Sequence, residues 1–319
     1  MFTDNKRVQV YKEKRIFMNI KFKKWGLGES PRTDLAIETH EFNVESGKDD
    51  GIKVETYMSS GVEITKATVY AGKGEKESGK RAGVYITADV GTLYLKTSSE
   101  FESIAITVSR IISELIPKDD GCVLVAGIGN AEIISDAVGP ETVSKVIATR
   151  HIKKMKEDIY HSLNLKETVT VQTDVMGNTG IESAEIVSAL VEKIKPKCVI
   201  AVDSLASRKL SRLASTVQIS NSGIMPGAGV ANRRLELNEE TVGVPVIAIG
   251  VPTVVDAFTL IRDLLTENAN IELLREQNNF YVAPKESGRI IKDASKLLAA
   301  SINMALHGLT LSEVTELQQ

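Results

Sequence analysis

Residues 122–140 read CVLVAGIGNAEIISDAVGP, an apolar run followed by a glycine-rich turn and an aspartate. The run Cys122–Ala126 predicts a buried strand, and Gly127 and Gly129 allow the sharp turn that follows it. Asp136 comes at or near the start of a helix, where unpaired backbone N–H groups favour an anion. A strand, a turn and an acid in this order predict one edge of an active site.

The second half of the chain repeats this alternation of strand and helix, which is typical of a mostly parallel sheet covered by helices on both faces. The predicted strands are Cys122–Ala126, Thr168–Thr173, Cys198–Val202, Thr216–Ile219 and Val244–Ile249. The predicted helices are Asp136–His151, Ile181–Ile194, Arg208–Ala214, Val255–Asn268 and Arg289–Leu306. The fold class is therefore α/β.

The N-terminal third has a different pattern. Apolar and polar residues alternate from Ile52 to Leu95, which predicts an additional, smaller antiparallel β region with a hairpin at about 52–95. A loop rich in Gly and Lys, Gly72–Gly83, joins its strands. We expect Asn43–Gly51 to be a loop and Ile104–Leu115 to be helical.

Composition excludes several classes of protein. The chain has 319 residues, of which 42% are apolar and 25% charged, so it can bury a large core and is unlike disordered or membrane proteins. A net charge of −3 argues against a nucleic-acid binder of the basic-patch kind. The N-terminus shows no secretory signal, so we expect a cytoplasmic protein without a disulfide between Cys122 and Cys198.

Charge is unevenly distributed along the chain. Residues 1–34 carry nine Lys and Arg against four acids, a net charge of +5 that leaves −8 on the rest. Such a basic segment can dock on the acidic body, bind another anionic surface, or be a solvated tail.

Acids recur where the predicted parallel strands end, the edge at which open α/β sheets bind ligands. These acids are Asp136, Asp174, Glu182, Asp203 and Asp256. Two carboxylates held close together share a proton and can activate a water molecule for amide hydrolysis. Asp136, Asp174 and Asp256 also precede helices, so each has the alternative role of a helix cap.

The residues that other common catalytic and binding sites require are missing from these loops. None of the four histidines lies in these loops, so a Ser/His/Asp triad and a His-ligated zinc site are not predicted. A phosphate loop is absent from the sequence as well. Carboxylates alone can hold a hard or divalent metal ion, and this alternative stays open.

Five stretches of sequence follow the predicted strands: Gly127–Asn130 with Ser135–Pro140, Asp174–Ser183, Val202–Arg208, Asn221–Asn232 and Gly250–Ala257. They resemble the corresponding loops of the spore germination protease family of endospore-forming bacteria. The resemblance covers about Arg32 to the C-terminus.

The resemblance implies an endopeptidase that degrades small acid-soluble spore proteins during germination, classed as an atypical aspartic peptidase. It places the two catalytic aspartates on Asp136 and Asp203, and leaves Asp174, Glu182 and Asp256 for substrate binding or support. No cofactor or metal is expected. The implied fold is similar to that of the hydrogenase-maturation peptidases, which use nickel, so a metal-dependent peptidase is the alternative.

The resemblance also implies a zymogen that cuts itself between Asp34 and Leu35, within Asp34-Leu35-Ala36-Ile37-Glu38. We therefore expect a propeptide at 1–34 and a single catalytic domain at 35–319. The family's propeptides are shorter, which makes Met18 an alternative start. Further expectations are a homotetramer in the forespore or spore core, without direct nucleic-acid or membrane partners. A binding protein that has kept the fold is the non-enzymatic alternative.

Overall fold

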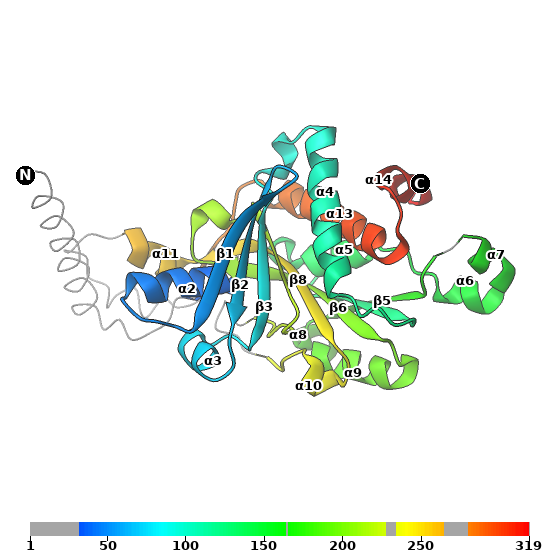
Figure 1. Cartoon of the computed structure of the whole chain (residues 1–319), viewed down its shortest axis with the longest axis horizontal. Helices are drawn as coiled ribbons and strands as arrows, with labels where there is room; N and C mark the ends of the chain where they lie inside the picture. The colour runs from blue at the N-terminus through cyan, green and yellow to red at the C-terminus, as the bar shows by residue number, and fades with distance from the viewer. Residues whose placement is uncertain (1–31, 164, 228–233, 265–279, 319) are drawn as a thin grey trace, which may run out of the picture.

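The computed structural model of the protein describes residues 32–163, 165–227, 234–264 and 280–318. Within these ranges the strands are β1 (Ile52–Ser59), β2 (Val62–Val69), β3 (Gly83–Asp89), β4 (Val123–Ile128), β5 (Thr168–Asp174), β6 (Cys198–Ser207), β7 (Thr216–Ser220), β8 (Val246–Asp256) and β9 (Tyr281–Val282). They form one sheet with the order β1-β2-β3-β7-β8-β6-β4-β5, and β9 pairs with β8 (Figure 1).

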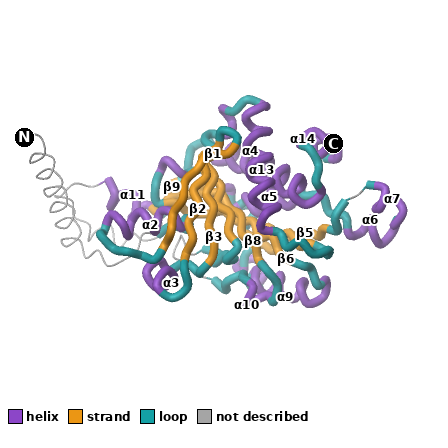
Figure 2. The backbone as a smooth tube through the Cα atoms, viewed as in Figure 1, coloured by secondary structure: helices purple, strands orange, loops and turns teal. Residues whose placement is uncertain are grey.

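The α-helices in the same ranges are α2 (Ala36–Glu45), α3 (Lys73–Ser78), α4 (Ser98–Leu115), α5 (Val138–Val143), α6 (Arg150–Met155), α7 (Glu157–Ser162), α8 (Met176–Thr179), α9 (Ser183–Ile194), α10 (Glu239–Val242), α11 (Ala257–Leu264), α13 (Ser287–His307) and α14 (Leu311–Leu317). Short 3₁₀ turns are η1 (Leu93–Leu95), η2 (Ile134–Asp136) and η3 (Leu210–Arg212). Helices lie on both sides of the sheet (Figure 2).

The strands β8, β6, β4 and β5 are parallel and form the centre of the fold. In β4, Val123 and Val125 pack toward α4, α5 and α13, whereas Leu124 and Ala126 pack toward α9 and α10. Both sets are buried because successive side chains of a strand point to opposite faces. The predicted α/β class, with a parallel sheet covered on both faces, is confirmed.

The predicted antiparallel region is also present, but it is part of the same sheet. Strands β1, β2 and β3 pair antiparallel, and β3 pairs antiparallel with β7. The strand predicted at Thr216–Ile219 forms, yet it is antiparallel to β8. Its connection from β6, residues 208–215, is shorter than the dozen or so residues that a parallel crossover needs.

Two predicted helices are wrong. The helix expected over Asp136–His151 breaks after Val143, because Asn303 of α13 accepts a hydrogen bond from Ile147 N–H (2.9 Å) and donates one to the carbonyl of Lys145 (3.1 Å). The side chain thus replaces the partners that a continuing helix would supply. The helix expected over Arg208–Ala214 is reduced to η3.

Two predicted loops are partly helical. Helix α3 occupies part of Gly72–Gly83, and α2 extends to Glu45, inside the loop expected from Asn43. Residues 265–268, the end of a predicted helix, lie outside the described residues. So do residues 1–31, and the division into propeptide and catalytic domain stays a prediction.

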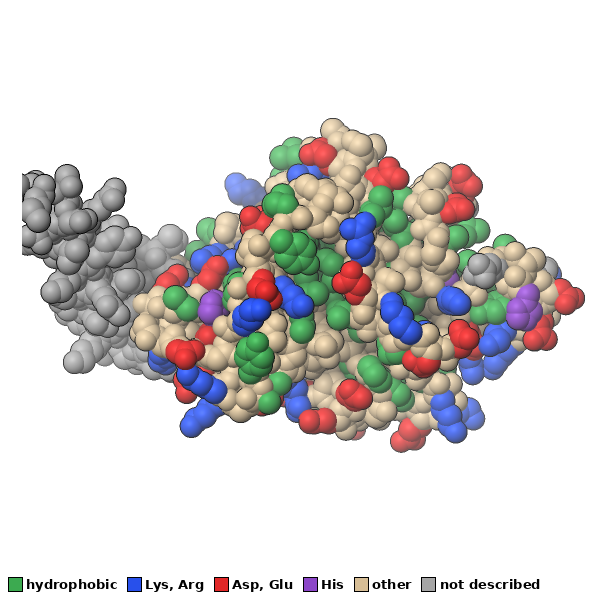
Figure 3. Space-filling model, in the orientation of Figure 1, with side chains coloured by type: hydrophobic (Ala, Val, Ile, Leu, Met, Phe, Trp, Pro, Cys, Tyr) green, Lys and Arg blue, Asp and Glu red, His purple; other side chains and the backbone are tan. Residues whose placement is uncertain are grey.

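Charged side chains of both signs are spread over the face shown in Figure 3, with Lys and Arg next to Asp and Glu. In the described part of the chain, no single helix is long and apolar enough to cross a membrane. The bent pair α13 and α14 passes that test together, by length and composition only. Much of α13 is buried against the sheet.

Gly139 of α5 lies against the backbones of β4 and β6. A Cβ at this position would be 2.2 Å from the carbonyl oxygen of Ile128 and 2.4 Å from that of Val202. We expect Gly139→Ala to lower the free energy of unfolding by about 3 kcal/mol, because backbone atoms cannot move aside. Urea unfolding measures this loss. Gly177→Ala, whose Cβ meets nothing within 4 Å, is the control; an equal loss in both variants would contradict the packing argument.

Candidate active site

Asp136 lies at the end of η2, after the glycine-rich turn that leaves β4. The backbone N–H of Asn130 donates to Asp136 Oδ2 at 2.9 Å, which fixes the carboxylate against the turn. Gly129 has φ +110°, and a Cβ there would be 2.2 Å from the Asp136 carbonyl oxygen. The glycine is therefore required for the close approach of the strand end to Asp136.

Asp203 lies within β6 and is almost completely buried, with 4% of its surface exposed. Its Oδ1 accepts a hydrogen bond from the backbone N–H of Ser204 at 2.8 Å. The hydroxyl oxygen of Ser204 in turn accepts one from the N–H of Val138, at the start of α5, at 3.3 Å. These contacts link the strand that carries Asp203 to the helix that follows Asp136.

The charge of Asp136 affects the protonation of Asp203. Burial raises the pKa of Asp203 well above its ordinary value, and the charges of Asp136 and Asp34 add to this effect. Burial also raises the pKa of Asp136, while the Asn130 N–H and Arg234 oppose the rise. Because Asp203 is the more deeply buried, burial favours its protonated form more strongly than it does that of Asp136.

Asp174, at the end of β5, lies at the rim of this pair. It adopts a left-handed backbone conformation with φ +57°, and its Oδ1 accepts hydrogen bonds from Val175 N–H (2.7 Å) and the Asn178 amide (3.1 Å). Its charge contributes to the raised pKa of Asp136. Asp34 and Asp136 are thus within electrostatic range of Asp203, and Asp174 is within range of Asp136.

Asp256 acts as a helix cap, the structural alternative that the sequence left open for it. Its Oδ1 accepts hydrogen bonds from the backbone N–H (2.8 Å) and hydroxyl (2.7 Å) of Thr259, which caps α11. Its Oδ2 also pairs with Arg32 at 3.1 Å, two residues before Asp34. Asp256 therefore holds the chain that leads to the predicted cleavage site.

Glu182 lies at the N-terminus of α9, where its backbone N–H donates to the carboxylate of Glu185 at 2.9 Å. Within the described ranges, no hydrogen bond or ion pair connects its side chain to Asp136 or Asp203. The prediction that Glu182 supports the site stays untested.

The predicted cleavage peptide lies beside the end of β6. Asp34 N–H donates to the carbonyl of Ala206 at 2.9 Å, and Ala206 N–H donates to Asp34 Oδ2 at 2.8 Å. Leu35 is fully buried and packs with Leu205 and Ile37. The peptide is thus fixed three residues beyond Asp203 on the same strand.

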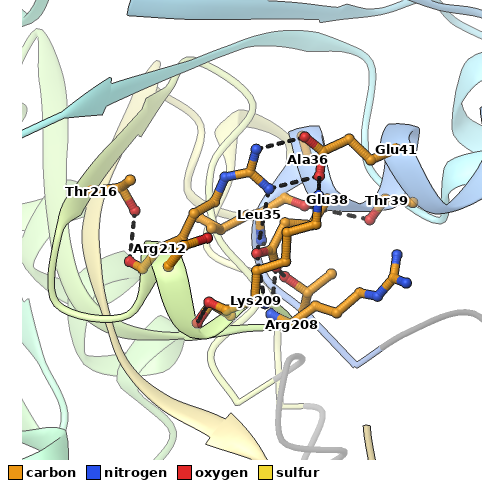
Figure 4. Close-up of polar contacts among 12 residues, drawn as sticks. Leu35, Ala36, Glu38, Thr39, Glu41, Arg208, Lys209, Arg212 and Thr216 are labelled. Carbon is orange, nitrogen blue, oxygen red and sulfur yellow. Dashed lines mark hydrogen bonds and ion pairs between the residues drawn. The ribbon is translucent and has the colours of Figure 1, made fainter. Parts of the chain in front are cut away.

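Glu38, near the start of α2, anchors this peptide. It is fully buried, and its carboxylate accepts hydrogen bonds from Thr33 hydroxyl (2.5 Å) and the backbone N–H groups of Arg208 (2.5 Å) and Lys209 (3.0 Å). Arg212 pairs with Glu38 at 3.5 Å and with Glu41 at 2.6 Å (Figure 4). Glu38 thus ties α2 to the segment that follows β6.

A cavity of about 500 Å³ adjoins the peptide, and its wall includes Asp34, Tyr85, Leu205, Gln218 and Gly250. Asp136 and Asp203 are not part of that wall. The cavity therefore extends from the cleavage peptide rather than from the aspartate pair.

Sequence reasoning missed three features near these aspartates. The charge of Arg234 opposes the rise in pKa of both Asp136 and Asp203. Sequence reasoning did not select Arg234, because it lies beyond the motif that ends at Asn232. Arg212 follows Arg208 by four residues, which is the spacing of a helix. This pattern gave no indication that Arg212 pairs with Glu38 and Glu41. Gln218 alternates with Val217 and Ile219 in a strand, a pattern that looks like an exposed position although Gln218 is buried.

The thiols are poor candidates for a nucleophile. Cys122 and Cys198 are buried and free of disulfides, and burial raises their pKa values to about 11 and about 12. Among the described residues, no group of three or more His, Cys, Asp and Glu side chains is placed to hold a metal ion.

Open α/β sheets bind their ligands at the carboxyl ends of the parallel strands, and in this protein acids lie at those ends. The protein thus has the architecture of an α/β enzyme with its ligand site at that edge. The sequence model described as germination protease (Peptidase_A25) matches residues 32–268. The chain therefore belongs to the germination protease family, and the prediction of a peptidase that acts in spore germination is confirmed.

Individual relatives agree with this assignment. The germination proteases of Clostridium acetobutylicum and Caldanaerobacter subterraneus subsp. tengcongensis are each 38% identical over 90% of this chain, and the alignments cover 98% and 97% of those proteins. That of Bacillus cytotoxicus is 39% identical over 73% of this chain and 65% of its own length. A solved [NiFe] hydrogenase maturation protease, HycI from Thermococcus kodakarensis, is 14% identical with a TM-score of 0.34, covering 60% of this chain and 98% of its own.

The raised pKa of Asp203 makes stability depend on pH. Because the folded chain binds this proton more tightly than the unfolded chain, the free energy of unfolding falls as the pH rises from the ordinary value of 3.8 toward the raised pKa. We expect Asp203→Asn to be more stable than the wild type at pH 7, because Asn has no proton to lose as the pH rises. The difference should shrink toward pH 4. Urea unfolding across this range measures it; a wild type more stable than the variant at pH 7 would contradict the burial argument.

Proposed function

We propose that the chain is an endopeptidase of the aspartic type that is made as a zymogen and cuts itself between Asp34 and Leu35. After activation it degrades small acid-soluble spore proteins in the spore core, as a homotetramer. The observation that carries the self-cleavage is the position of the Asp34–Leu35 peptide, which is bound to β6 close enough for the Asp34 charge to raise the pKa of Asp203.

In the proposed reaction, Asp136 is the base and Asp203 the acid. Asp136 accepts a proton from water as its oxygen adds to the carbonyl carbon of Asp34, and Asp203 gives its proton to the carbonyl oxygen. Asp136 then gives its proton to the nitrogen of Leu35 and the C–N bond breaks, so that this nitrogen leaves as an amine while one hydroxyl of the intermediate returns its proton to Asp203. The products are a new carboxyl group on Asp34 and a new amino group on Leu35. The higher pKa of Asp203 supports this assignment, because its proton must still be present when Asp136 is ionised.

Incubation of the purified full-length chain at mildly acidic pH tests this function. We expect intact-mass and N-terminal analysis to show loss of residues 1–34 and a new N-terminus at Leu35. The product should cut a peptide containing Glu-Phe-Ala-Ser-Glu after its first Glu. Strong chelators should leave both rates unchanged.

Two results would overturn the proposal. A chain that stays full length and leaves the peptide intact would be a binding protein on the same fold. Activity that chelators remove and a divalent metal restores would establish the metal-dependent alternative.

A further inference from the structure

Gln218, on β7, contacts the main chain on both sides of the proposed cleavage point. Its amide nitrogen donates to the carbonyl oxygen of Asp34 at 3.1 Å, and its amide oxygen accepts from the N–H of Ala36 at 2.9 Å. The two partners, one acceptor and one donor, determine which way the amide points. The peptide bond between Asp34 and Leu35 therefore lies within the reach of a single side chain.

The other main-chain group of this bond is also held. The N–H of Leu35 donates to the hydroxyl oxygen of Thr33 at 3.1 Å. Leu35 and Ala36 are fully buried, and Gln218 is 8% exposed, so these hydrogen bonds are shielded from water. Hydrogen bonds in such surroundings are stronger electrostatically than in water.

The sheet register places Gln218 on the same row as Asp203. Gln218 of β7 is opposite Gly250 of β8, and Gly250 is opposite Asp203 of β6. Residues in one row point to the same face, and two strand spacings separate the Cα atoms of Gln218 and Asp203 by about 10 Å. The carbonyl that Gln218 holds thus lies on the face of the sheet that carries Asp203.

Leu205 occupies the space above Gly250 in this row. A Cβ on Gly250 would be 2.5 Å from Leu205 Cγ, and Leu205 packs with Leu35. The side chain of Leu205 therefore covers the gap between Gln218 and Asp203. The proposed proton transfer from Asp203 to the Asp34 carbonyl requires Leu205 to move aside.

We propose that Gln218 is a catalytic residue of self-cleavage, which orients the Asp34–Leu35 peptide and stabilises the negative charge that develops on the Asp34 carbonyl oxygen. The inference rests on the proposed self-cleavage. When water adds to the carbonyl carbon, the oxygen gains charge, and an N–H already directed at it lowers the barrier. The alternative is a purely structural role, in which Gln218 only caps α2. The N–H of Ala36 is at the N-terminus of this helix, has no acceptor within the helix, and is satisfied by Gln218.

Gln218→Glu separates these two roles. The substituted carboxylate keeps an acceptor for Ala36 N–H but, when ionised, has no proton to donate to the Asp34 carbonyl. We expect self-cleavage of the full-length chain to slow by about 10²–10³ at pH 7, the cost of losing one such donor. The ratio of wild-type to variant rates should fall as the pH is lowered to 5, because a protonated carboxyl donates again.

Three further variants complete the experiment, with the fragment that begins at Leu35 measured by mass. Gln218→Met, which has neither donor nor acceptor, should be slow at every pH. Thr87→Val, opposite Gln218 on the side away from Asp203, should cleave at the wild-type rate. Asp203→Asn reports on the proposed function itself.

Wild-type rates in Gln218→Glu, or a slowing that is equal at all pH values, would overturn the role of Gln218 while Asp203→Asn remained inactive. Normal cleavage in Asp203→Asn would overturn the proposed function instead. If Gln218→Met unfolds, the pH dependence of Gln218→Glu still decides the question.

Discussion

We expect Asp203→Asn to lower the rate of cleavage at Asp34–Leu35 by about 10²–10⁴. This is the expected loss when a group that transfers a proton in the transition state is removed. Asn has nearly the size of Asp and keeps an oxygen that can accept the hydrogen bond from Ser204 N–H, so the local packing is preserved. The same loss should appear with a peptide that spans residues 29–43. Both rates are measured by mass spectrometry of the products.

Asp89→Asn is the matched control, because Asp89 is an exposed carboxylate at the end of β3 in the same sheet. We expect it to cleave at the wild-type rate. Asp136→Asn should be as inactive as Asp203→Asn, and the double variant should be no slower than either, since the two groups act as one unit. Self-processing at a normal rate in Asp203→Asn would refute the aspartate pair.

Glu38→Ala lowers the free energy of unfolding by about 3–5 kcal/mol. The change leaves the N–H groups of Arg208 and Lys209 without their acceptor and deprives Arg212 of one of its two partners. Breaking a buried ion pair by removing one member costs this amount, because the remaining groups stay buried. Urea unfolding of the full-length chain in the inactive Asp203→Asn background measures the loss without interference from cleavage.

Glu55→Ala is the comparison for this variant. Glu55 also pairs with a cation, Lys53, at 2.9 Å, but both side chains are at least half exposed. An exposed pair contributes about 0–1 kcal/mol, so we expect a small change. Equal losses in the two variants would show that burial of Glu38 does not determine the strength of the anchor.

The sequence predicted the parallel centre of the fold because its strands are continuous apolar runs between helices. Cys122–Ala126 and Cys198–Val202 both have this pattern, and the structure extends each into the loop that follows. The helix predicted at Ile181–Ile194 begins two residues later than expected, at Ser183. In these places the local pattern of apolar residues is sufficient to predict the element, because it determines which side chains are buried.

Tertiary contacts decided the regions where prediction was wrong. The helix after Asp136 ends early because Asn303, far away in the sequence, binds its main chain. The helix after β6 is reduced to one turn, because Ala214 has a left-handed backbone (φ +58°) and its N–H donates to the distant carbonyl of Pro252 at 2.7 Å. Neither partner is recognisable from the spacing of residues near the segment that it changes.

The position of acids at strand ends was predictable, because parallel strands bring their carboxyl ends to one edge. The separate roles of those acids were not. Asp256 caps a helix and holds Arg32, whereas Asp203 is buried beside Asp136, and both come at the end of an apolar run. The contacts of Asp34 with Ala206 and Gln218 depend on residues more than 170 positions apart.

The pKa of Asp203, followed by carboxyl ¹³C NMR in the full-length chain and in Asp136→Asn, tests most directly whether the two aspartates form one proton-sharing pair. We expect the pKa of Asp203 to lie well above 3.8 in the wild type. We also expect Asp136→Asn to lower this pKa, because the negative charge that favours the protonated form is removed. An Asp203 that titrates near 3.8, or whose pKa is unchanged in Asp136→Asn, would contradict the pair.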